Sequence, residues 1–228
     1  MSNTVCIVRA KFDIGLLPSS PTLEFEQALW QQSFCTIAGL DEAGRGALAG
    51  PLFAAAVILP KGRSLDLLHG LAGVRDSKQL SPAKREVAAN LIKSIALDWG
   101  IGVISAAEID ENGMAKAGRL VFERALASLK TVPDHLLVDY FKLPALKIPQ
   151  TALIKGDARS LSIACASILA KTARDKAMRD LDQLYPDFGF VVNKGYGTAA
   201  HRQALVKHGT CPEHRQCFQL FKVQEELF

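Results

Sequence analysis

Four acidic side chains lie next to short apolar segments, in positions where carboxylates can carry metal-assisted chemistry. Asp41 and Glu42 follow one apolar run, Asp139 ends another, and Asp157 lies just before a predicted helix. Ligand sites in α/β sheets gather at strand ends because loops converge there. Clustered carboxylates repel one another and lose hydration on burial, and a divalent cation such as Mg²⁺ or Mn²⁺ offsets that cost. These four residues are therefore the candidate metal ligands.

A glycine-rich turn directly after the acidic pair strengthens this interpretation. A single Asp is more often a turn former or a helix cap, and glycine-rich hairpin turns are common. Here the segment Gly44-Arg45-Gly46 stands beside Asp41 and Glu42. Glycine lets a sugar or another backbone approach closely, and the arginine fork matches phosphate. The position of the turn beside the acidic pair is what indicates a functional site.

The elements that must position these residues alternate between short apolar strands and helices. Two apolar runs around the glycine-rich turn predict a hairpin of adjacent strands. Strands are predicted over about 36–40, 52–59, 99–106 and 135–139. Helices are predicted over about 22–32, 82–95, 120–129, 160–178 and 198–208. A hairpin followed by alternating helices and strands indicates an α/β fold with a mixed sheet.

Helical spacing identifies the faces that we expect to be buried. Val87, Leu91 and Ile95 recur every four residues, after a serine cap and a proline at 81–82. The faces predicted for three further helices are Leu23, Ala28 and Leu29; Leu120, Val121, Leu126 and Leu129; and Ile163, Ser167 and Ala170.

Composition and length bound the class of protein. The chain has 228 residues, 49% of them hydrophobic, which is enough to bury a core and excludes a mainly disordered protein. A net charge of +4 permits an anionic partner without requiring one.

No apolar run reaches the roughly 18–20 residues of a membrane helix, and no signal peptide is recognisable, so we expect a cytoplasmic protein without membrane contact. The break at Pro18-Ser19-Ser20-Pro21 predicts a flexible extension over residues 1–20 and one domain over 21–228.

Five cysteines without a C-x-x-C pair predict reduced thiols rather than a disulfide framework. One alternative is a zinc site, because His208, Cys211, His214 and Cys217 recur every three residues. Zinc modules usually separate two close ligand pairs by a longer loop, which this run lacks. Solvated histidines and free cysteines are therefore the favoured interpretation.

Long motifs along the chain resemble those of bacterial ribonuclease HII. The first is IAGLDEAGRG, which starts at Ile37, and it continues to Leu59. Later motifs follow in the same order: Asp76-Ser77-Lys78, Leu80-Ser81, Arg85, Val138-Asp139, Lys155-Gly156-Asp157, 162–171, Arg174-Asp175, Lys194-Gly195-Tyr196-Gly197-Thr198, His201 and His214-Arg215. The match spans about residues 35–218, so a chance similarity is excluded.

The resemblance implies a ribonuclease H-like fold within residues 21–228, with a mixed central sheet flanked by helices and a helical C-terminal part. It implies hydrolysis of RNA in RNA/DNA hybrids, and cleavage 5′ of ribonucleotides embedded in duplex DNA that leaves 3′-hydroxyl and 5′-phosphate ends. It assigns the catalytic and metal-binding roles to Asp41, Glu42, Asp139 and Asp157. Two Mg²⁺ or Mn²⁺ ions would act there, with Asp41 as the shared ligand, and a plain helix cap stays open for Asp157.

The same resemblance implies how substrate is bound. The backbone of Gly44, Arg45 and Gly46 would sense the ribose 2′-hydroxyl, and the Tyr196 ring would stack on the sugar at the RNA–DNA junction. An ordinary turn aromatic is the alternative for Tyr196. Phosphate contacts, or support of the acidic cluster, fall to Lys78, Lys155, Lys171, Arg174 and Lys194. A replication or transcription partner could recruit the enzyme, but no motif in the sequence identifies one.

Two departures inside the matched segment, a third in residues 1 to about 20, which have no family counterpart, and three rival interpretations complete the prediction. Ala47 stands where the family usually has proline, which predicts a looser turn, and Tyr140 stands where glycine is common, which predicts crowding beside Asp139. A non-catalytic nucleic-acid-binding module would not need four carboxylates. A metal phosphohydrolase for small molecules would not need Tyr196. Ribonuclease HIII carries an additional N-terminal domain, for which the roughly 35 residues before Thr36 are too few.

Overall fold

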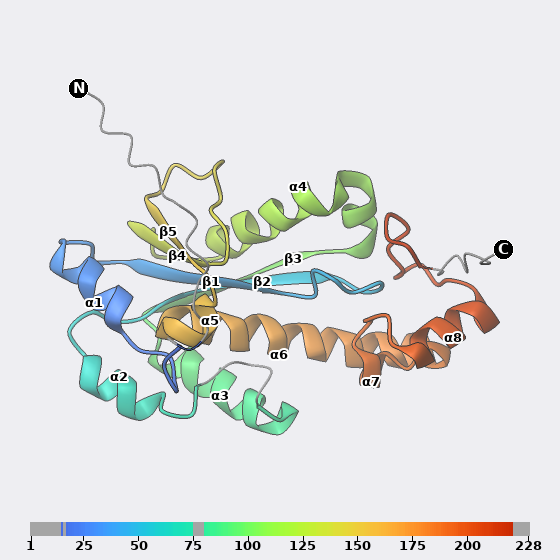
Figure 1. Cartoon of the computed structure of the whole chain (residues 1–228), viewed down its shortest axis with the longest axis horizontal. Helices are drawn as coiled ribbons and strands as arrows, with labels where there is room; N and C mark the ends of the chain where they lie inside the picture. The colour runs from blue at the N-terminus through green and yellow to red at the C-terminus, as the bar shows by residue number, and fades with distance from the viewer. Residues whose placement is uncertain (1–14, 16, 75–79, 221–228) are drawn as a thin grey trace.

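The computed structural model describes residues 15, 17–74 and 80–220, and a five-stranded sheet forms its centre (Figure 1). The strands are β1 (Ile37–Ala43), β2 (Leu52–Ile58), β3 (Asp98–Ile104), β4 (His135–Asp139) and β5 (Gln150–Leu153). Their spatial order is β3-β2-β1-β4-β5. The β1–β2 and β2–β3 pairs are antiparallel, and the β1–β4 and β4–β5 pairs are parallel. The predicted α/β class with a mixed sheet is confirmed, and β5 is an edge strand that the sequence prediction lacks.

Helices cover both faces of this sheet. They are α1 (Glu24–Gln31), α2 (Ser64–Gly70), α3 (Pro82–Ile95), α4 (Ala106–Ala127), α5 (Gly156–Arg159), α6 (Leu161–Leu184), the 3₁₀ helix η3 (Pro186–Phe188), α7 (Phe190–Asn193) and α8 (Ala199–His208). Helix α6 lies along one face against β1 and β2, and α4 covers the other face (Figure 1). Helices α1, α2 and α3 pack on the α6 side, and the last three helices form the helical C-terminal part.

Strand β1 contributes to two hydrophobic cores at once. Ile37 packs on the α6 side of the sheet, whereas Ala38 and Leu40 pack on the α4 side, as the two-residue period of a strand requires. All three side chains are buried. Because both faces are covered, the central strands are nearly continuous apolar runs, and an acidic residue inside one of them needs a specific reason.

Hydroxyl side chains fix where four helices begin. Ser81, Ser105, Ser160 and Thr198 each occupy the N-cap and accept a hydrogen bond from the backbone N–H three residues later. The predicted helix starts near 82, 160 and 198 are therefore confirmed. The strand predicted over 99–106 ends earlier, at Ile104, because Ser105 and Glu108 form a capping box that begins α4.

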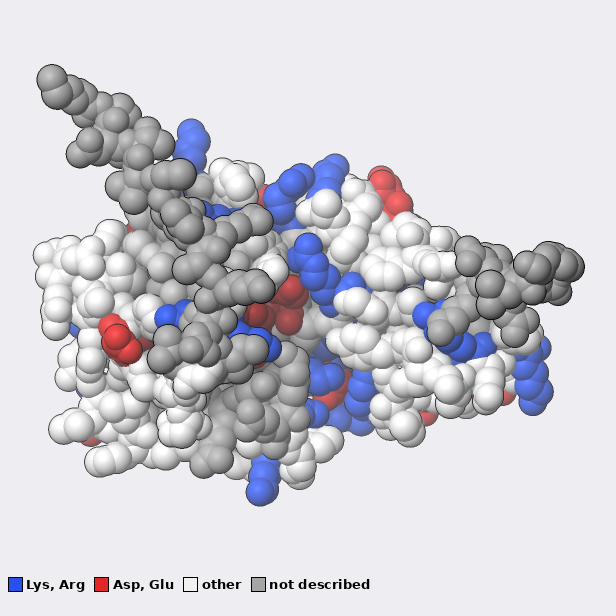
Figure 2. Space-filling model, viewed as in Figure 1, with Lys and Arg blue, Asp and Glu red and all other residues white. Residues whose placement is uncertain are grey.

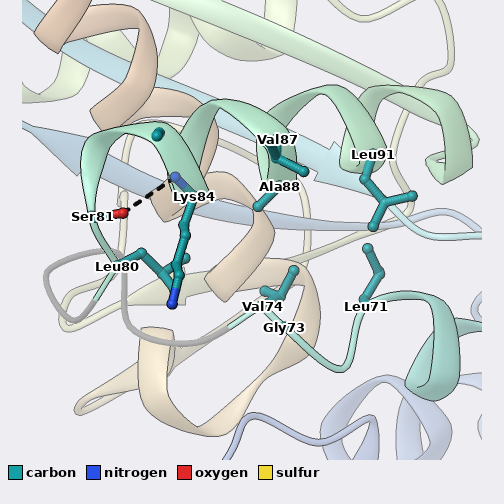
Figure 3. A pocket seen from close by; sticks show the side chains of 10 residues that line it. Leu71, Gly73, Val74, Leu80, Ser81, Lys84, Val87, Ala88 and Leu91 are labelled. Atoms are coloured by element: carbon teal, nitrogen blue, oxygen red, sulfur yellow. Dashed lines mark hydrogen bonds between the residues drawn. The ribbon is translucent and has the colours of Figure 1, made fainter.

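The buried face predicted for α3 is wrong. Val87 is 70% exposed and Leu91 is 39% exposed. Both line a groove of about 830 Å³ together with Leu71 and Val74 (Figure 3). The buried residues of α3 are instead Arg85, Ala88, Ala89 and Ile92. Helix α3 packs against α6, and the small alanine side chains permit a close approach that the larger apolar residues would prevent.

A buried glutamate anchors α1 to the start of α6. The Glu26 carboxylate accepts hydrogen bonds from the hydroxyls of Ser160 and Ser162, both at 2.6 Å, and from the Ser162 backbone N–H at 2.9 Å. Ala28, predicted on the buried face of α1, is exposed.

Thr22 forms a parallel bridge with Ser160. These contacts begin after residue 20, and the domain boundary at 20/21 stays a prediction. Across the described ranges, no helix combines the length and apolar character needed to cross a membrane.

Candidate active site

The predicted site residues meet in one cleft of about 550 Å³ at the carboxyl ends of β1 and β4. The cleft is lined by Asp41, Glu42, Ala43, Gly44, Arg45, Gly46, Asp139, Asp157, Ser167, Lys171 and Tyr196. Of the residues predicted for catalysis, sugar recognition or phosphate binding, Lys155, Arg174 and Lys194 do not line the cleft, and Lys78 lies outside the described residues. Figure 2 shows acidic side chains grouped near the centre of the viewed face, with basic side chains on several sides of them.

Asp41 and Glu42 lie inside β1 rather than after it, because pairing with β2 continues through Ala43. Burial raises the pKa of Asp41 well above its usual range, and the nearby carboxylates of Asp139 and Glu42 raise it further. A hydrogen bond from the Ser167 side chain acts in the opposite direction. The Glu42 backbone N–H donates to Asp41 Oδ1 at 2.7 Å and so orients the carboxylate. An ionised Asp41 is unfavourable here without further positive charge.

Glu42 has a partner that Asp41 lacks. Burial raises the pKa of the Glu42 carboxyl, whereas the Arg45 guanidinium lowers it. Arg45 Nη1 lies 3.7 Å from Glu42 Oε1. The acidic pair therefore divides into a buried member, Asp41, and a member, Glu42, that faces the arginine of the turn.

Asp139 and Asp157 enter the cleft from the parallel half of the sheet. Asp139 is the last residue of β4, and its Oδ1 accepts a hydrogen bond from the Gly156 backbone N–H at 2.7 Å. Asp157 follows in the short helix α5 and is 6% exposed. Asp157 is not a helix cap, because Lys155 occupies the N-cap of α5. Backbone pairing and this hydrogen bond thus bring the two aspartates to the same end of the sheet.

The glycine-rich turn is built on a buried arginine. Gly44 has a φ of +98°, and a β-carbon there would lie 2.0 Å from Nε of Arg174, so only glycine fits. Arg174 is fully buried and donates to the carbonyl oxygens of Pro51 at 3.1 Å and Ala49 at 3.3 Å. Gly46 differs, because none of the described atoms lies within 4 Å of a β-carbon placed on it. Open space therefore adjoins Gly46, which is one of the residues that line the cleft.

Arg45 is held from both ends. Its guanidinium lies 5.0 Å from the centre of the Phe141 ring, and its carbonyl accepts a hydrogen bond from Arg215 Nη1 at 3.1 Å. The side chain is 44% exposed. Arg45 is thus oriented along the rim while still accessible to a phosphate.

The two departures from the family pattern have consequences that differ from the prediction. The Ala47 backbone N–H donates to the Gly44 carbonyl at 3.2 Å, a bond that proline cannot form, so this position helps to close the turn. Tyr140 has a φ of +67°, which explains why glycine suits it, but its side chain is 70% exposed. The predicted crowding beside Asp139 is therefore wrong.

Tyr196 reaches the cleft from the loop between α7 and α8. It is 38% exposed, and the Arg174 guanidinium lies 5.3 Å from the centre of its ring. Arg174 therefore contacts both Gly44 and Tyr196, the two parts that the resemblance assigns to sugar recognition. Its complete burial makes Arg174 a structural support rather than a phosphate contact.

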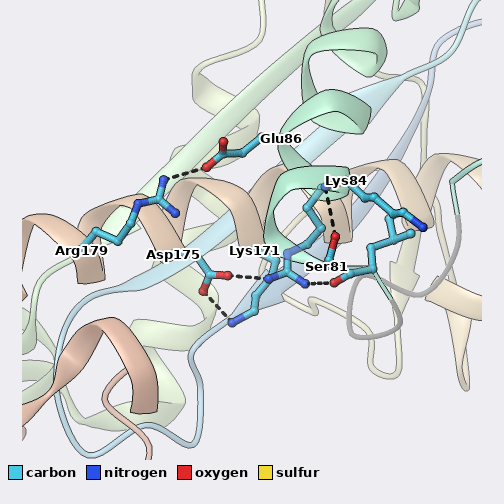
Figure 4. A network of polar contacts seen from close by, with 8 residues as sticks. Ser81, Lys84, Glu86, Lys171, Asp175 and Arg179 are labelled. Carbon is cyan, nitrogen blue, oxygen red and sulfur yellow. Dashed lines mark hydrogen bonds and ion pairs between the residues drawn. The ribbon is translucent and has the colours of Figure 1, made fainter.

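Of the remaining predicted basic residues, Lys171 lies at the cleft. Its Nζ lies 2.7 Å from Asp175 Oδ1, and Arg85 Nη2 lies 2.9 Å from the other carboxylate oxygen (Figure 4). Asp175 and Arg85 are buried, so the ion pairs hold the lysine against the cleft wall. Lys155 and Lys194 are not among the lining residues, and burial lowers the pKa of Lys194.

Ser167 is a site residue that sequence reasoning missed. The sequence places it only on the buried face of α6, which is confirmed, since it is 5% exposed. The structure shows in addition that it hydrogen-bonds to Asp41. The available signal was a hydroxyl in the middle of an otherwise apolar helix face, where an unpaired polar group would be costly.

The four residues of the zinc alternative are not gathered at one point. His214 and Cys211 are buried and in contact, whereas His208 and Cys217 are exposed. Within 17–74 and 80–220, no three His, Cys, Asp or Glu side chains form a group ready to hold a metal ion. This applies to the acidic cleft as well, although its four carboxylates line one space.

The fold and the acidic cleft define a ribonuclease of the H type. The structure is similar to the crystal structure of ribonuclease H2 from Pyrococcus horikoshii OT3, with a TM-score of 0.69 and 28% identity over 81% of this chain and 94% of that one. Its fold is also similar to that of Bst-RNase HIII, which was crystallised in complex with Mn²⁺. There the TM-score is 0.66 and the identity 19%, over 82% of this chain and 68% of that one.

The chain belongs to the ribonuclease HII family, whose profile matches residues 38–222. Ribonuclease HII of Desulfitobacterium hafniense (strain DSM 10664 / DCB-2) is 48% identical over 205 residues, which cover 90% of this chain and 76% of that protein. Ribonuclease HII of Moorella thermoacetica is 50% identical over 194 residues, which cover 85% and 91%. The family resemblance is confirmed, and the chain is a ribonuclease H-type endoribonuclease.

Proposed function

We propose that this chain is a divalent-metal-dependent endonuclease that cuts on the 5′ side of a ribonucleotide embedded in duplex DNA. It also hydrolyses the RNA strand of RNA/DNA hybrids, and its products carry 3′-hydroxyl and 5′-phosphate ends. The observation that carries the proposal is the convergence of four carboxylates, the 44–46 turn and the Tyr196 ring on one cleft. A phosphohydrolase for small molecules would use the carboxylates but has no need of a turn and a ring that suit a sugar.

The donor set of the cleft fits a hard divalent cation. Asp41, Glu42, Asp139 and Asp157 would hold it, since carboxylate oxygens are the ligands that Mg²⁺ and Mn²⁺ prefer. The raised pKa of Asp41 supports this assignment, because a bound cation would remove the cost of burying the charged carboxylate. When bound, two such ions supply an acidified water and offset the negative charge that develops at the scissile phosphate.

The chain's own residues then position the substrate. Gly46 leaves space for a ribose to approach the turn, whose backbone groups can sense the 2′-hydroxyl. Arg45 presents an exposed guanidinium at the rim, where its fork can bind a phosphate. The Tyr196 ring can stack on the sugar at the RNA–DNA junction, and the ammonium of Lys171 adds positive charge at the cleft wall.

A panel of labelled substrates tests the proposal. The panel contains a duplex with one ribonucleotide, a continuous RNA/DNA hybrid, an all-DNA duplex and a small phosphate ester, each given to the wild type and to Asp41→Asn. We expect the wild type to cleave only the first two substrates and the variant to cleave none. Efficient turnover of the phosphate ester or of the all-DNA duplex would contradict the proposal.

A further inference from the structure

Two buried histidines behind Tyr196 form a pair that the proposed reaction does not use. His201 lies in α8 and is fully buried, and His214, in the segment after α8, is 1% exposed. Their Nε2 atoms are 3.1 Å apart, and both rings pack against Phe188 and Phe190. Two N–H groups cannot face each other at this distance, and neither can two lone pairs, so one nitrogen must donate and the other accept.

The outer nitrogen of each ring decides which one donates. His201 Nδ1 lies 2.9 Å from the carbonyl oxygen of Tyr196, which can only accept, so the His201 proton is on Nδ1. His201 Nε2 then carries only a lone pair, so His214 Nε2 must hold the proton and donate to it. His214 Nδ1 accepts from the backbone N–H of Cys211 at 2.9 Å, which is closer than the Cys211 carbonyl oxygen at 3.3 Å. A continuous chain of hydrogen bonds therefore runs from Cys211 through His214 and His201 to the Tyr196 carbonyl.

The surroundings keep both rings neutral. Burial lowers the pKa of His201, and Arg202 lowers it further. Burial, followed by the neighbouring His201, lowers the pKa of His214 to about 4. The Cys211 Sγ lies 3.2 Å from His214 Nδ1, and burial raises the thiol pKa, so the thiol stays protonated. Among the described residues, further titratable or charged groups near the pair include His208, Glu213 and Arg215.

The residue after His214 connects the same region to the glycine-rich turn. Arg215 is fully buried and donates to the carbonyl oxygens of Gly50, at 2.8 and 3.0 Å, and Arg45, at 3.1 Å. Two consecutive residues are thus linked to the two halves of the proposed sugar-recognition unit, one of them indirectly. His214 acts on Tyr196 through His201, and Arg215 acts on the turn.

We infer that His201 and His214 are positioning residues for substrate choice, which as a neutral pair of opposite tautomers fix Tyr196 relative to the 44–46 turn. This inference rests on the proposed role of Tyr196. A substrate that is misplaced by about 1 Å can react about 100-fold more slowly. A single embedded ribonucleotide offers one register, whereas a continuous hybrid offers many equivalent ones, so disturbing the pair should harm cleavage at the single ribonucleotide more.

Nuclear magnetic resonance tests the pair without reference to activity. Long-range ¹H–¹⁵N spectra of the full chain labelled with [¹⁵N]histidine distinguish a proton on Nδ1 from one on Nε2. At pH 7 we expect His201 to be protonated on Nδ1 only and His214 on Nε2 only. The same tautomer on both rings, or an imidazolium on either, would overturn the inference.

Kinetics test the positioning role through the kcat/KM for the one-ribonucleotide duplex divided by that for the continuous hybrid. We expect this ratio to fall roughly tenfold in His201→Phe, which cannot hold the Tyr196 carbonyl. His201→Asn, whose amide can still donate to that carbonyl, should keep most of the ratio. His208→Asn changes an exposed histidine of the same helix and should leave the ratio unchanged.

The variants also separate two ways of failing. If Tyr196→Ala keeps the wild-type ratio, the proposed role of Tyr196 fails, and the positioning role fails with it. If Tyr196→Ala changes the ratio but a folded His201→Phe does not, only the present inference fails. An equal loss in His201→Asn and His201→Phe would also overturn it. Should His201→Phe not fold, the asparagine variant and the wild-type spectra still decide the question.

Discussion

The acidic cleft and the histidine pair both bury titratable groups, but the groups of the cleft repel one another, whereas those of the pair form hydrogen bonds. In the cleft, burial and like charges raise the pKa of Asp41, and the Ser167 hydrogen bond opposes them only in part. In the pair, burial lowers the pKa of His214, and the ring nitrogens of both histidines face complementary partners inside the protein. In the cleft, a bound cation can offset the free-energy cost of a charged, buried Asp41. In the pair, each ring nitrogen already has a hydrogen-bond partner within the protein.

This difference separates a binding site from its support. A buried polar group whose partners all lie within the protein stabilises one arrangement of the chain. A buried carboxylate whose pKa is raised by burial and by neighbouring carboxylates indicates a place where a ligand can stabilise the charge. Tyr196 belongs to both regions, because its ring lines the cleft and its carbonyl ends the hydrogen-bond chain.

The largest effect is expected from Asp41→Asn. We expect the cleavage rate to fall more than about 100-fold. Replacing a residue that only hydrogen-bonds to a metal ligand costs at most about that much. The folded pKa of Asp41 lies above its unfolded value, so at pH 7 the charged carboxylate destabilises the fold. The variant should therefore have a higher Tm than the wild type in chelator. Substantial cleavage by the folded variant at saturating Mg²⁺ or Mn²⁺ would remove Asp41 from the site.

Tyr196→Ala should reduce cleavage at a single ribonucleotide by about 5- to 150-fold, since stacking on a nucleotide contributes about 1–3 kcal/mol. The reduction should be smaller on a continuous hybrid, and Tyr196→Phe should retain much of the activity because it keeps the ring. Arg45→Ala is the control and should depress both substrates alike. An alanine variant with the wild-type rates would make Tyr196 an ordinary turn residue.

Two glycines of the turn should respond in opposite ways. Gly46→Ala should keep the wild-type Tm but reduce cleavage about tenfold, because the added methyl group occupies space meant for substrate. Gly44→Ala should lower the Tm, because a left-handed backbone costs a non-glycine residue roughly 1–2 kcal/mol and the methyl group meets Arg174. Thermal unfolding and kcat/KM of both variants check this. Full activity in Gly46→Ala would show that no substrate approaches there.

The histidine pair predicts a stability that depends on pH. The folded pKa of His214 is about 4 against an ordinary 6.5, so the unfolded chain binds its proton first as the pH falls. The neutral His214 ring contributes at most about 3 kcal/mol to the free energy of unfolding. This stabilisation is fully present above pH 6.5 and is lost progressively as the pH falls toward 4. Urea unfolding at pH 7 and pH 5 measures how much the free energy of unfolding falls between the two pH values. We expect this fall to be smaller in His214→Gln than in the wild type. His208→Gln should behave as the wild type, and an unchanged loss in His214→Gln would contradict the account.

The smallest effect is expected from removal of residues 1–20. The contacts of Thr22 with the start of α6 remain in the shortened chain, so the first helix keeps its attachment. Activity should stay within a few-fold of the full chain on both substrates. A truncated protein that folds but does not cleave would show that the removed segment contributes to the site.

Local patterns were sufficient to predict the carboxylates and the class of fold. Asp41, Glu42 and Asp139 stand out because acidic residues interrupt or end apolar strands, and Ser81, Ser160 and Thr198 mark helix starts through short-range hydrogen bonds. The strand was nevertheless ended too early at residue 40, because an acidic pair gives no apolar signal inside a strand whose pairing continues.

Features that depend on contacts distant in sequence could not be predicted. The spacing of Val87 and Leu91 suggested a buried face, but the packing of α3 on α6 selects the alanines instead. The role of Ser167 requires α6 to lie beneath β1, and the partnership of His201 and His214 requires the C-terminal segment to fold back. The cytoplasmic location and a recruiting partner stay predictions.

The central claim is that the four carboxylates hold divalent cations that cut beside a ribonucleotide. The measurement that tests it most directly is cleavage of an end-labelled duplex containing one ribonucleotide, mapped at nucleotide resolution with Mg²⁺, Mn²⁺ or chelator. The account predicts a single cut on the 5′ side of the ribonucleotide, leaving 3′-hydroxyl and 5′-phosphate ends, with either ion and none with chelator. Cleavage that persists in chelator, or cuts that do not depend on the position of the ribonucleotide, would contradict it.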